Sequence, residues 1–70
     1  MKLSARNQFQ GKVKSVKLGN VMAEEVVVDI GGGHEIVSAI TRASAEDLAL
    51  SQGASVTAVI KATEVILAKN

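Results

Sequence analysis

The sequence contains no cysteine and no proline, and it has a single histidine, His34, and a single aromatic residue, Phe9. Without cysteine the chain can form no disulfide, and one histidine cannot supply the His/Cys cluster of a structural zinc site. A lone aromatic side chain leaves little for nucleic-acid bases to stack on. Proline in an edge strand blocks pairing with another chain. Because the sequence contains no proline, its edge strands lack this protection and are free to pair between chains.

The charged residues form no stripe of one sign. Eight Lys/Arg stand against seven Asp/Glu, for a net charge of +1, and the two signs are interspersed along the chain. This balance disfavours nucleic acid as a partner. No apolar run approaches the roughly 20 residues that a membrane span needs, and the amino terminus turns polar after Leu3, unlike a secretory signal. We therefore expect no membrane partner and a cytoplasmic location.

The chain is short, and its composition is apolar for its size. We expect its 70 residues to form one domain, 1–70, and a chain of this size buries only roughly 60% of the surface that its unfolded form exposes. Yet 47% of the residues are hydrophobic, and the mean hydropathy is +0.25. With disulfides and zinc excluded, association with further subunits is the remaining source of stability. The sequence therefore predicts a homo-oligomer that buries apolar area between its subunits.

A first strand is predicted over residues 8–18. Val13 alternates with charged neighbours, and the alternation then shifts its phase, which predicts a bulge near Ser15. Gly11 inside this strand permits strong coiling or a close approach of another backbone. A turn at Gly19-Asn20 should follow, because both residue types tolerate positive φ.

Two more strands are predicted around three consecutive glycines. Residues 22–30 are apolar on parts of both faces, as in an interior or interface strand. The glycines at 31–33 predict a hairpin to residues 34–41, with antiparallel pairing. Their spacing fits neither the P-loop nor the Rossmann pattern, so a phosphate-binding loop is disfavoured.

The last part of the chain predicts a short helix and two strands. Ser44 resembles an N-cap followed by acidic residues, which predicts a helix over 44–50 with Leu48 as its core anchor. Extended segments are expected over residues 55–61 and 64–68. The predicted fold class is therefore all-β: a small five-stranded OB-like barrel with one short helix before strand 4.

A cluster of hydrogen-bond donors precedes the first strand. Ser4, Arg6 and Asn7 carry a hydroxyl, a guanidinium and a carboxamide, and Ala5 between them lets another backbone come close. These groups suit an anion. Taken alone, such a cluster is more often the solvent-exposed start of a strand. It therefore indicates a binding site only together with a second group of residues that faces it.

Several motifs carry a resemblance to a known family. They are residues 4–8 (Ser-Ala-Arg-Asn-Gln), 11–13 (Gly-Lys-Val), 23–24 (Ala-Glu), the triple glycine and 57–65 (Thr-Ala-Val-Ile-Lys-Ala-Thr-Glu-Val). In these motifs the chain resembles the molbindins, small cytoplasmic molybdate-binding proteins with a Mop-type TOBE domain. The resemblance implies an OB-like barrel that assembles as a homohexamer, a trimer of dimers, and binds molybdate or tungstate between subunits.

The resemblance also implies the site residues. It places Ser4, Ala5, Arg6 and Asn7 on one side of an intersubunit oxyanion site and Lys61, Ala62 and Thr63 on the other. Arg6 is expected to fix its loop and present backbone N–H groups, while Lys61 supplies much of the charge. A second oxyanion site, near a threefold axis, would involve Asn20 and Val21, but Met22 departs from the polar Asn that relatives often carry there.

The donor types suit the expected ligand. Molybdate is a tetrahedral dianion whose oxygens carry no proton near neutral pH, so its pocket should contain donors only. Phosphate carries a proton in much of its population, and an all-donor pocket leaves that proton unpaired at a cost of roughly 1–3 kcal/mol. Sulfate must be rejected by size, and tungstate should bind nearly as well as molybdate.

The sequence offers little support for an enzyme. Glu24 and Glu25 are adjacent on a strand and point to opposite faces, and the sequence offers no nucleophile–base pair, so we expect no enzyme, no catalytic residue, no catalytic cofactor and no metal ligated directly by the protein. His34 is expected to be an exposed strand start. The alternatives are an OB-like nucleic-acid-binding module and a structural oligomer whose anion site has decayed.

Overall fold

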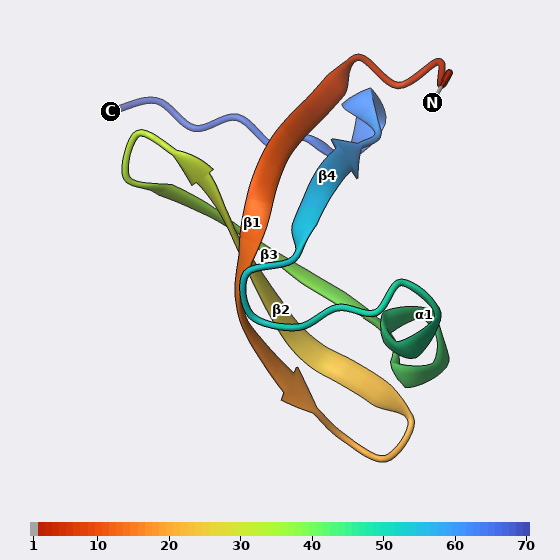
Figure 1. Cartoon of the computed structure of the whole chain (residues 1–70). Coiled ribbons are helices and arrows are strands. Elements are labelled where there is room, and N and C mark those ends of the chain that lie inside the picture. The colour runs from red at the N-terminus through yellow and green to blue at the C-terminus, as the bar shows by residue number, and fades with distance from the viewer. Residues whose placement is uncertain (1) are drawn as a thin grey trace.

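The computed structural model describes residues 2–70, apart from the Glu24 side chain. In chain order its elements are strands β1 (Asn7–Leu18), β2 (Met22–Gly31) and β3 (His34–Thr41), helix α1 (Arg42–Asp47), strand β4 (Ser55–Ile60) and a single 3-10 turn, η1 (Ala62–Glu64) (Figure 1). The all-β fold class, with one short helix before the fourth strand, is confirmed.

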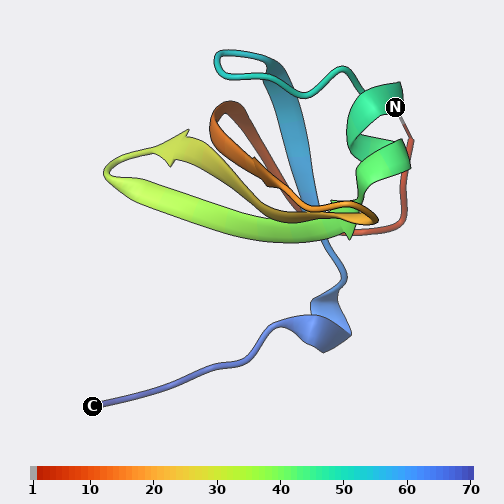
Figure 2. The ribbon, with the colours of Figure 1, turned by 90° about the horizontal axis from the view of Figure 1, so that it is seen from below.

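The strands form one antiparallel sheet in the order β3-β2-β1-β4. β1 pairs with two neighbours along its length. Its first half lies beside β4, from Asn7 opposite Ile60 to Lys12 opposite Ser55, and its second half lies beside β2. The sheet curls strongly, as Figures 1 and 2 show, so that β4 stands at an angle to β2 and β3. β3 and β4 are left as the two edges of a partly open barrel.

The curl depends on Gly11 and on a bulge. A Cβ atom at Gly11 would lie 2.4 Å from the Asp29 carbonyl oxygen and 2.9 Å from a Val28 methyl carbon, so β1 and β2 cross too closely there for any side chain. Just beyond, the register between β1 and β2 shifts between Val13 and Ser15. The predicted close approach and the predicted bulge are both confirmed, and together they bend β1 between its two partners.

The core of one chain is small and aliphatic. No described side chain larger than valine is buried. The cluster consists of Val13, Ala23, Val26, Val28 and Ala45, with half-buried residues such as Leu50 and Val56 packed against it. Val27 is also buried, so β2 is apolar on parts of both faces, as predicted. One chain therefore buries little apolar volume of its own.

The glycine hairpin between β2 and β3 forms as predicted. Gly31, Gly32 and Gly33 all have positive φ (89°, 63° and 79°), which residues with a side chain rarely adopt. The Asp29 carboxylate accepts a hydrogen bond from the Gly31 N–H (2.8 Å). The loop is thus closed by its own residues, and His34 beside it is exposed, as expected.

The helix begins earlier than predicted. Its N-cap is Thr41, whose hydroxyl accepts a hydrogen bond from the Ser44 N–H (3.1 Å), so the prediction of Ser44 as the cap was wrong. Both residues are good caps, and the pairing of Thr41 with Met22 at the end of the sheet fixes the earlier start. This start turns Ala45 inward and leaves Leu48 66% exposed, so Leu48 is not the core anchor.

Residues 64–68, predicted as the fifth strand, form no ladder with other described residues. η1 turns the chain after β4, held by a hydrogen bond from the Glu64 N–H to the Lys61 carbonyl oxygen (2.9 Å). Beyond the turn the backbone is extended at Val65 (φ −87°, ψ 119°) and leads away from the sheet (Figure 2). The expected extended conformation is therefore present at Val65, whereas Glu64 belongs to η1, and the segment pairs with no strand of the described sheet.

Replacing Gly11 tests the close crossing of β1 and β2. We expect Gly11→Ala to lower the free energy of unfolding by about 1–3 kcal/mol, because the new methyl group meets backbone that cannot move aside cheaply. Urea unfolding at fixed protein concentration measures this. Gln10→Ala, one residue away and exposed, should change stability by less than about 0.5 kcal/mol. Equal stability of the two variants would contradict the steric argument.

Candidate oxyanion-binding site

The pairing of β1 with β4 brings the two predicted motifs to the same end of the sheet. The first motif, residues 4–7, ends at Asn7, which lies opposite Ile60. Ile60 directly precedes the second motif, residues 61–63. In Figure 1 the start of β1 and the end of β4 lie side by side, with η1 just beyond β4. Residues 4–7 and 61–63, far apart in the sequence, therefore adjoin within one chain.

Two side chains hold the first motif in place. Asn7 Nδ2 donates to the Ile60 carbonyl oxygen (3.2 Å) and ties the motif to β4. Gln8 Nε2 donates to the Ala5 carbonyl oxygen (2.7 Å) and closes the bend that leads into β1. Arg6, which was expected to fix this loop, makes no hydrogen bond or ion pair with another described residue. Its guanidinium is left available.

The second motif, residues 61–63, overlaps η1. Lys61 is the N-cap of this turn, with an extended backbone (φ −61°, ψ 131°). The Ala62 carbonyl oxygen accepts from the Val65 N–H (3.3 Å). The Lys61 ammonium and the Thr63 hydroxyl, both on exposed residues, bond to no other described residue. The turn therefore presents an ammonium and a hydroxyl just beyond the end of β4, which pairs with the start of β1.

At this end of the sheet four carbonyl oxygens are engaged, whereas several donors are open. Ala5, Ile60, Lys61 and Ala62 each direct their carbonyl oxygen into an internal hydrogen bond. The N–H groups of Ala62 and Thr63 precede the first hydrogen bond of η1 and donate to no described atom. A surface with open donors and engaged acceptors favours an anion that carries no proton.

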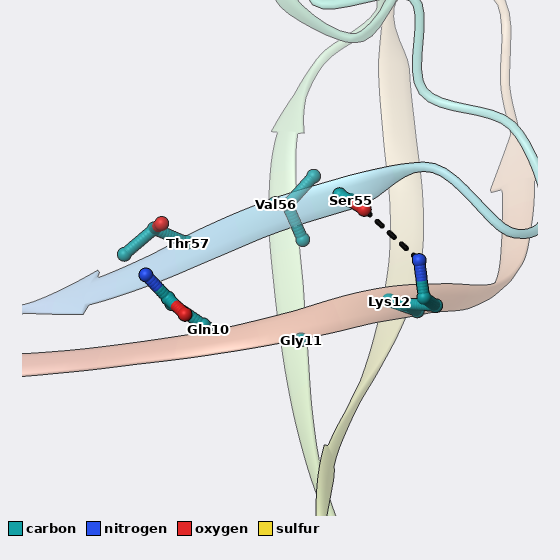
Figure 3. Close-up of a pocket in the computed structure, with 6 residues that line it drawn as sticks. All are labelled: Gln10, Gly11, Lys12, Ser55, Val56 and Thr57. Atoms are coloured by element: carbon teal, nitrogen blue, oxygen red, sulfur yellow. Dashed lines mark hydrogen bonds between the residues drawn. The ribbon is translucent and has the colours of Figure 1, made fainter.

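In one chain these residues form an open surface. Ala5 and Asn7 are half-buried, and the other predicted oxyanion residues are exposed. A hollow of about 570 Å³ lies further along β1 and β4, where Lys12 Nζ donates to Ser55 Oγ (3.0 Å) (Figure 3). It is lined by Gln10, Gly11, Lys12, Ser55, Val56 and Thr57, and by none of the predicted oxyanion residues.

The residues predicted for a second site lie at the other end of β1. Asn20 and Val21 belong to the turn between β1 and β2, and both are exposed. Arg42 holds this turn, because its backbone N–H donates to the Val21 carbonyl oxygen (2.8 Å) and its Nη1 to the Gly19 carbonyl oxygen (3.3 Å). Only Asn20 offers a side-chain donor within the turn, and Met22 beside it is apolar. The two predicted sites are not brought together.

Charges elsewhere pair across the surface. Lys14 Nζ lies 2.6 Å from Glu35 Oε1, and this hydrogen bond, together with the charge of Glu35, raises the pKa of Lys14 above its ordinary value. The described residues contain no group of three His, Cys, Asp or Glu side chains that could hold a metal ion.

No helix in residues 2–70 is long and apolar enough to cross a membrane.

Sequence reasoning missed two residues whose side chains hold the predicted sites in place, Gln8 and Arg42. Gln8 follows Ala5 by three residues, and a carboxamide at that spacing at the start of a strand could have indicated the loop-closing bond. The bond from Arg42 to Gly19 joins residues 23 positions apart. No local pattern carries that contact, because it depends on how the helix packs against the turn.

Comparisons with known proteins identify the family of this chain. Residues 3–67 match the model of the TOBE domain family. Molybdenum-pterin-binding protein 3 of Clostridium pasteurianum is 51% identical over 67 residues, which cover 96% of this chain and 97% of that protein. The solved structure of a molybdate binding protein from Sporomusa ovata gives a TM-score of 0.89 at 45% identity, over 99% of this chain and 100% of that one.

A further solved structure is that of ModG, described as a cytoplasmic molybdate-binding protein, with molybdate bound. It gives a TM-score of 0.89 at 45% identity, with 94% of this chain matching 46% of that one. The chain therefore belongs to the TOBE domain family and, within it, to the molbindins.

The loop-closing bond of Gln8 can be tested without a ligand. We expect Gln8→Ala to speed amide hydrogen exchange at residues 5–7 roughly two- to tenfold, because a hydrogen bond of this kind contributes about 0.5–1.5 kcal/mol to local stability. Hydrogen–deuterium exchange read by NMR measures it. Gln10→Ala removes the same side chain from the same strand, where it makes no hydrogen bond with a described residue, and should leave the loop unchanged. Equal exchange in both variants would show that Gln8 does not hold the loop.

Proposed function

We propose that this chain binds molybdate, and tungstate in the same site, and that it holds the oxyanion for storage, buffering or homeostasis inside the cell. The observation that carries the proposal is the surface at the β1–β4 end, where open donors from residues 4–7 and 61–63 adjoin and the neighbouring carbonyl oxygens are engaged. Relatives named for molybdate or molybdenum-pterin binding support the choice of ligand.

The proposed contacts use side chains and backbone together. The Arg6 guanidinium and the Lys61 ammonium neutralise the dianion, and the hydroxyls of Ser4 and Thr63 with free N–H groups of the turn donate to its oxygens. Ala5, Asn7 and Ala62 complete the set as in the family motif: Ala5 and Ala62 let the backbone approach, and Asn7 keeps the two motifs together. Glu64 lies next to the motif but is exposed, so its carboxylate can turn to solvent.

The closed site forms between subunits of a homohexamer, a trimer of dimers. One chain supplies an open wall, and a tetrahedral anion needs donors around it, so a second chain has to cover this wall. An oxyanion that binds only the assembled form stabilises that form by mass action. Asn20 and Val21 are proposed as a second oxyanion site near the threefold axis, with the Asn20 amide as its side-chain donor.

The proposed protein is a binding protein that works in the cytoplasm and does no chemistry on its ligand. ModG, which shares the fold, is described as cytoplasmic. Nucleic acid is not a proposed partner, because the +1 charge and one aromatic residue provide neither a basic groove nor a stacking platform.

Removing the two cations should weaken molybdate binding. We expect Arg6→Ala and Lys61→Ala each to raise the Kd for molybdate roughly 10- to 150-fold, because a hydrogen bond to a charged group contributes about 1.5–3 kcal/mol. Isothermal titration calorimetry on folded, assembled protein measures this.

Lys12→Ala is the matched control, since it removes an exposed cation from the hollow of Figure 3 on the same two strands. It should leave the Kd unchanged. A loss of binding in Lys12→Ala alone would move the site to that hollow. Absence of heat with the unaltered protein would refute molybdate binding, and such a result would favour a structural oligomer with a decayed site.

Competition by other anions tests the donor-only character of the site. Tungstate should displace molybdate at a similar concentration, since it has nearly the same shape and charge. Phosphate at pH 7 should need roughly 5- to 150-fold more, because its proton finds no acceptor, at a cost of about 1–3 kcal/mol. A displacement titration followed by calorimetry gives both values. Phosphate that competes as well as tungstate would show that the site contains an acceptor.

A further inference from the structure

The turn that is proposed as the second oxyanion site contains no charged residue. Residues 19–22 are Gly-Asn-Val-Met, so the Asn20 amide is the side-chain donor that the turn itself offers. A dianion that leaves water needs positive charge or charge-assisted hydrogen bonds in return. The turn alone therefore lacks the charge that molybdate requires.

Arg42 brings a cation to this turn from the first position of α1. Its backbone N–H donates to the Val21 carbonyl oxygen (2.8 Å), and its Nη1 donates to the Gly19 carbonyl oxygen (3.3 Å). Figure 2 shows α1 beside the β1–β2 turn. Lys17, which precedes the turn on β1, lies opposite Glu25 in the ladder. Arg42 is thus the cation that contacts the turn.

The Arg42 guanidinium still has open donors. Nε donates to Glu46 Oε1 (2.9 Å) and Nη1 to Gly19, whereas the N–H groups of Nη2 bond to no described residue. The side chain is 43% exposed, so these donors are accessible from solvent. A guanidinium has no acceptor atom and keeps its charge at any physiological pH.

The backbone of the turn shows the same pattern as the β1–β4 end of the sheet. The carbonyl oxygens of Gly19 and Val21 are engaged by Arg42, and that of Met22 accepts from the Gly19 N–H (2.6 Å). The N–H groups of Asn20 and Val21 donate to no described atom. Open backbone donors therefore lie next to the open donors of the guanidinium.

Glu46 is the acidic neighbour of this cluster. Its carboxylate pairs with Arg42 Nε, and the side chains of the two partners are 43% (Arg42) and 62% (Glu46) exposed. A solvent-exposed ion pair of this kind contributes little to stability. The Glu46 carboxylate can therefore turn to solvent at small cost when a dianion takes its place at the guanidinium.

We propose that Arg42 is a binding residue of the second oxyanion site and that its guanidinium supplies the positive charge that Asn20 and Val21 lack. The inference rests on the proposed second site at this turn, and it names the residue that makes this site selective for a dianion. Around a threefold axis every copy contributes its own Arg42, so the cations of neighbouring chains face one anion. This contribution offsets the apolar side chain of Met22.

Removing the charge of Arg42 should affect the second site alone. Calorimetric titration of the assembled protein with molybdate should show two classes of site, and native mass spectrometry counts the bound anions. We expect Arg42→Met to raise the Kd of the second class at least roughly tenfold, because it removes charge-assisted hydrogen bonds. The Kd of the first class, at Arg6 and Lys61, should change less than about twofold, since the two sites are far apart.

Lys14→Met is the matched control. Lys14 is also an exposed cation paired with a glutamate, Glu35, but it lies away from both proposed sites. This variant should leave the Kd of both classes unchanged. An equal loss at the second site in Lys14→Met and Arg42→Met would reduce the effect to overall charge and would overturn the proposal.

Perrhenate separates a charge contact from a structural role. It is a tetrahedral oxyanion of nearly the same shape as molybdate, but it carries one negative charge. Because attraction to a cation scales with the charge of the ligand, the ratio of the perrhenate Kd to the molybdate Kd at the second site should fall at least roughly fivefold in Arg42→Met. Arg42→Gln, which keeps a neutral amide donor, should show the same fall and decides the question if Arg42→Met does not assemble. If Arg42 only held the turn, both anions would weaken equally, and an unchanged ratio would overturn the proposal.

The outcomes distinguish this inference from the proposed function. Two classes of site that both persist in Arg42→Met refute the role of Arg42 and leave the second site standing. A single class in the unaltered protein refutes the second site together with this inference, while the first site stands. Absence of molybdate binding in the unaltered protein refutes the proposed function as a whole.

Discussion

The close crossing of β1 over β2 at Gly11 sets the rest of the architecture. Because no side chain separates the two backbones there, β1 can bend and serve two partners, β2 along its second half and β4 along its first. The pairing with β4 then brings residues 4–7 beside 61–63. The same bend swings β4 away from β3 and leaves an apolar groove between them. The candidate oxyanion surface and the open groove are thus two results of one missing side chain.

The chemistry of the candidate surface follows from its hydrogen bonds more than from its charge. A net charge of +1 exerts little attraction at a distance. What distinguishes this end of the sheet is that Gln8 and Asn7 engage the carbonyl oxygens of Ala5 and Ile60, while the donors around Lys61 stay open. Such a surface favours an oxyanion without a proton, because the proton of a bound group would find few acceptors.

Much of the fold could be predicted from local patterns, and the errors have physical causes. The bulge near Ser15, the close approach at Gly11 and the glycine hairpin are properties of neighbouring residues, so the sequence reveals them. The helix cap was misplaced because Thr41 and Ser44 are both good caps, and the end of the β2–β3 pairing decided between them. The adjacency of the site motifs within one chain follows from long-range register. The family resemblance had placed the two motifs on opposite sides of an intersubunit site. No local sequence pattern indicated the hydrogen bond from Arg42 to the Gly19 carbonyl oxygen.

The small core has a consequence for how such a chain behaves in solution. The buried side chains among the described residues are only valines and alanines, so the apolar area that one copy removes from water is limited. In the proposed oligomer, contacts with other copies add the further burial that stabilises the fold. Folding and association are then linked, and the apparent stability rises with the concentration of the chain. For a protein of this kind, dilution acts in the same direction as a denaturant.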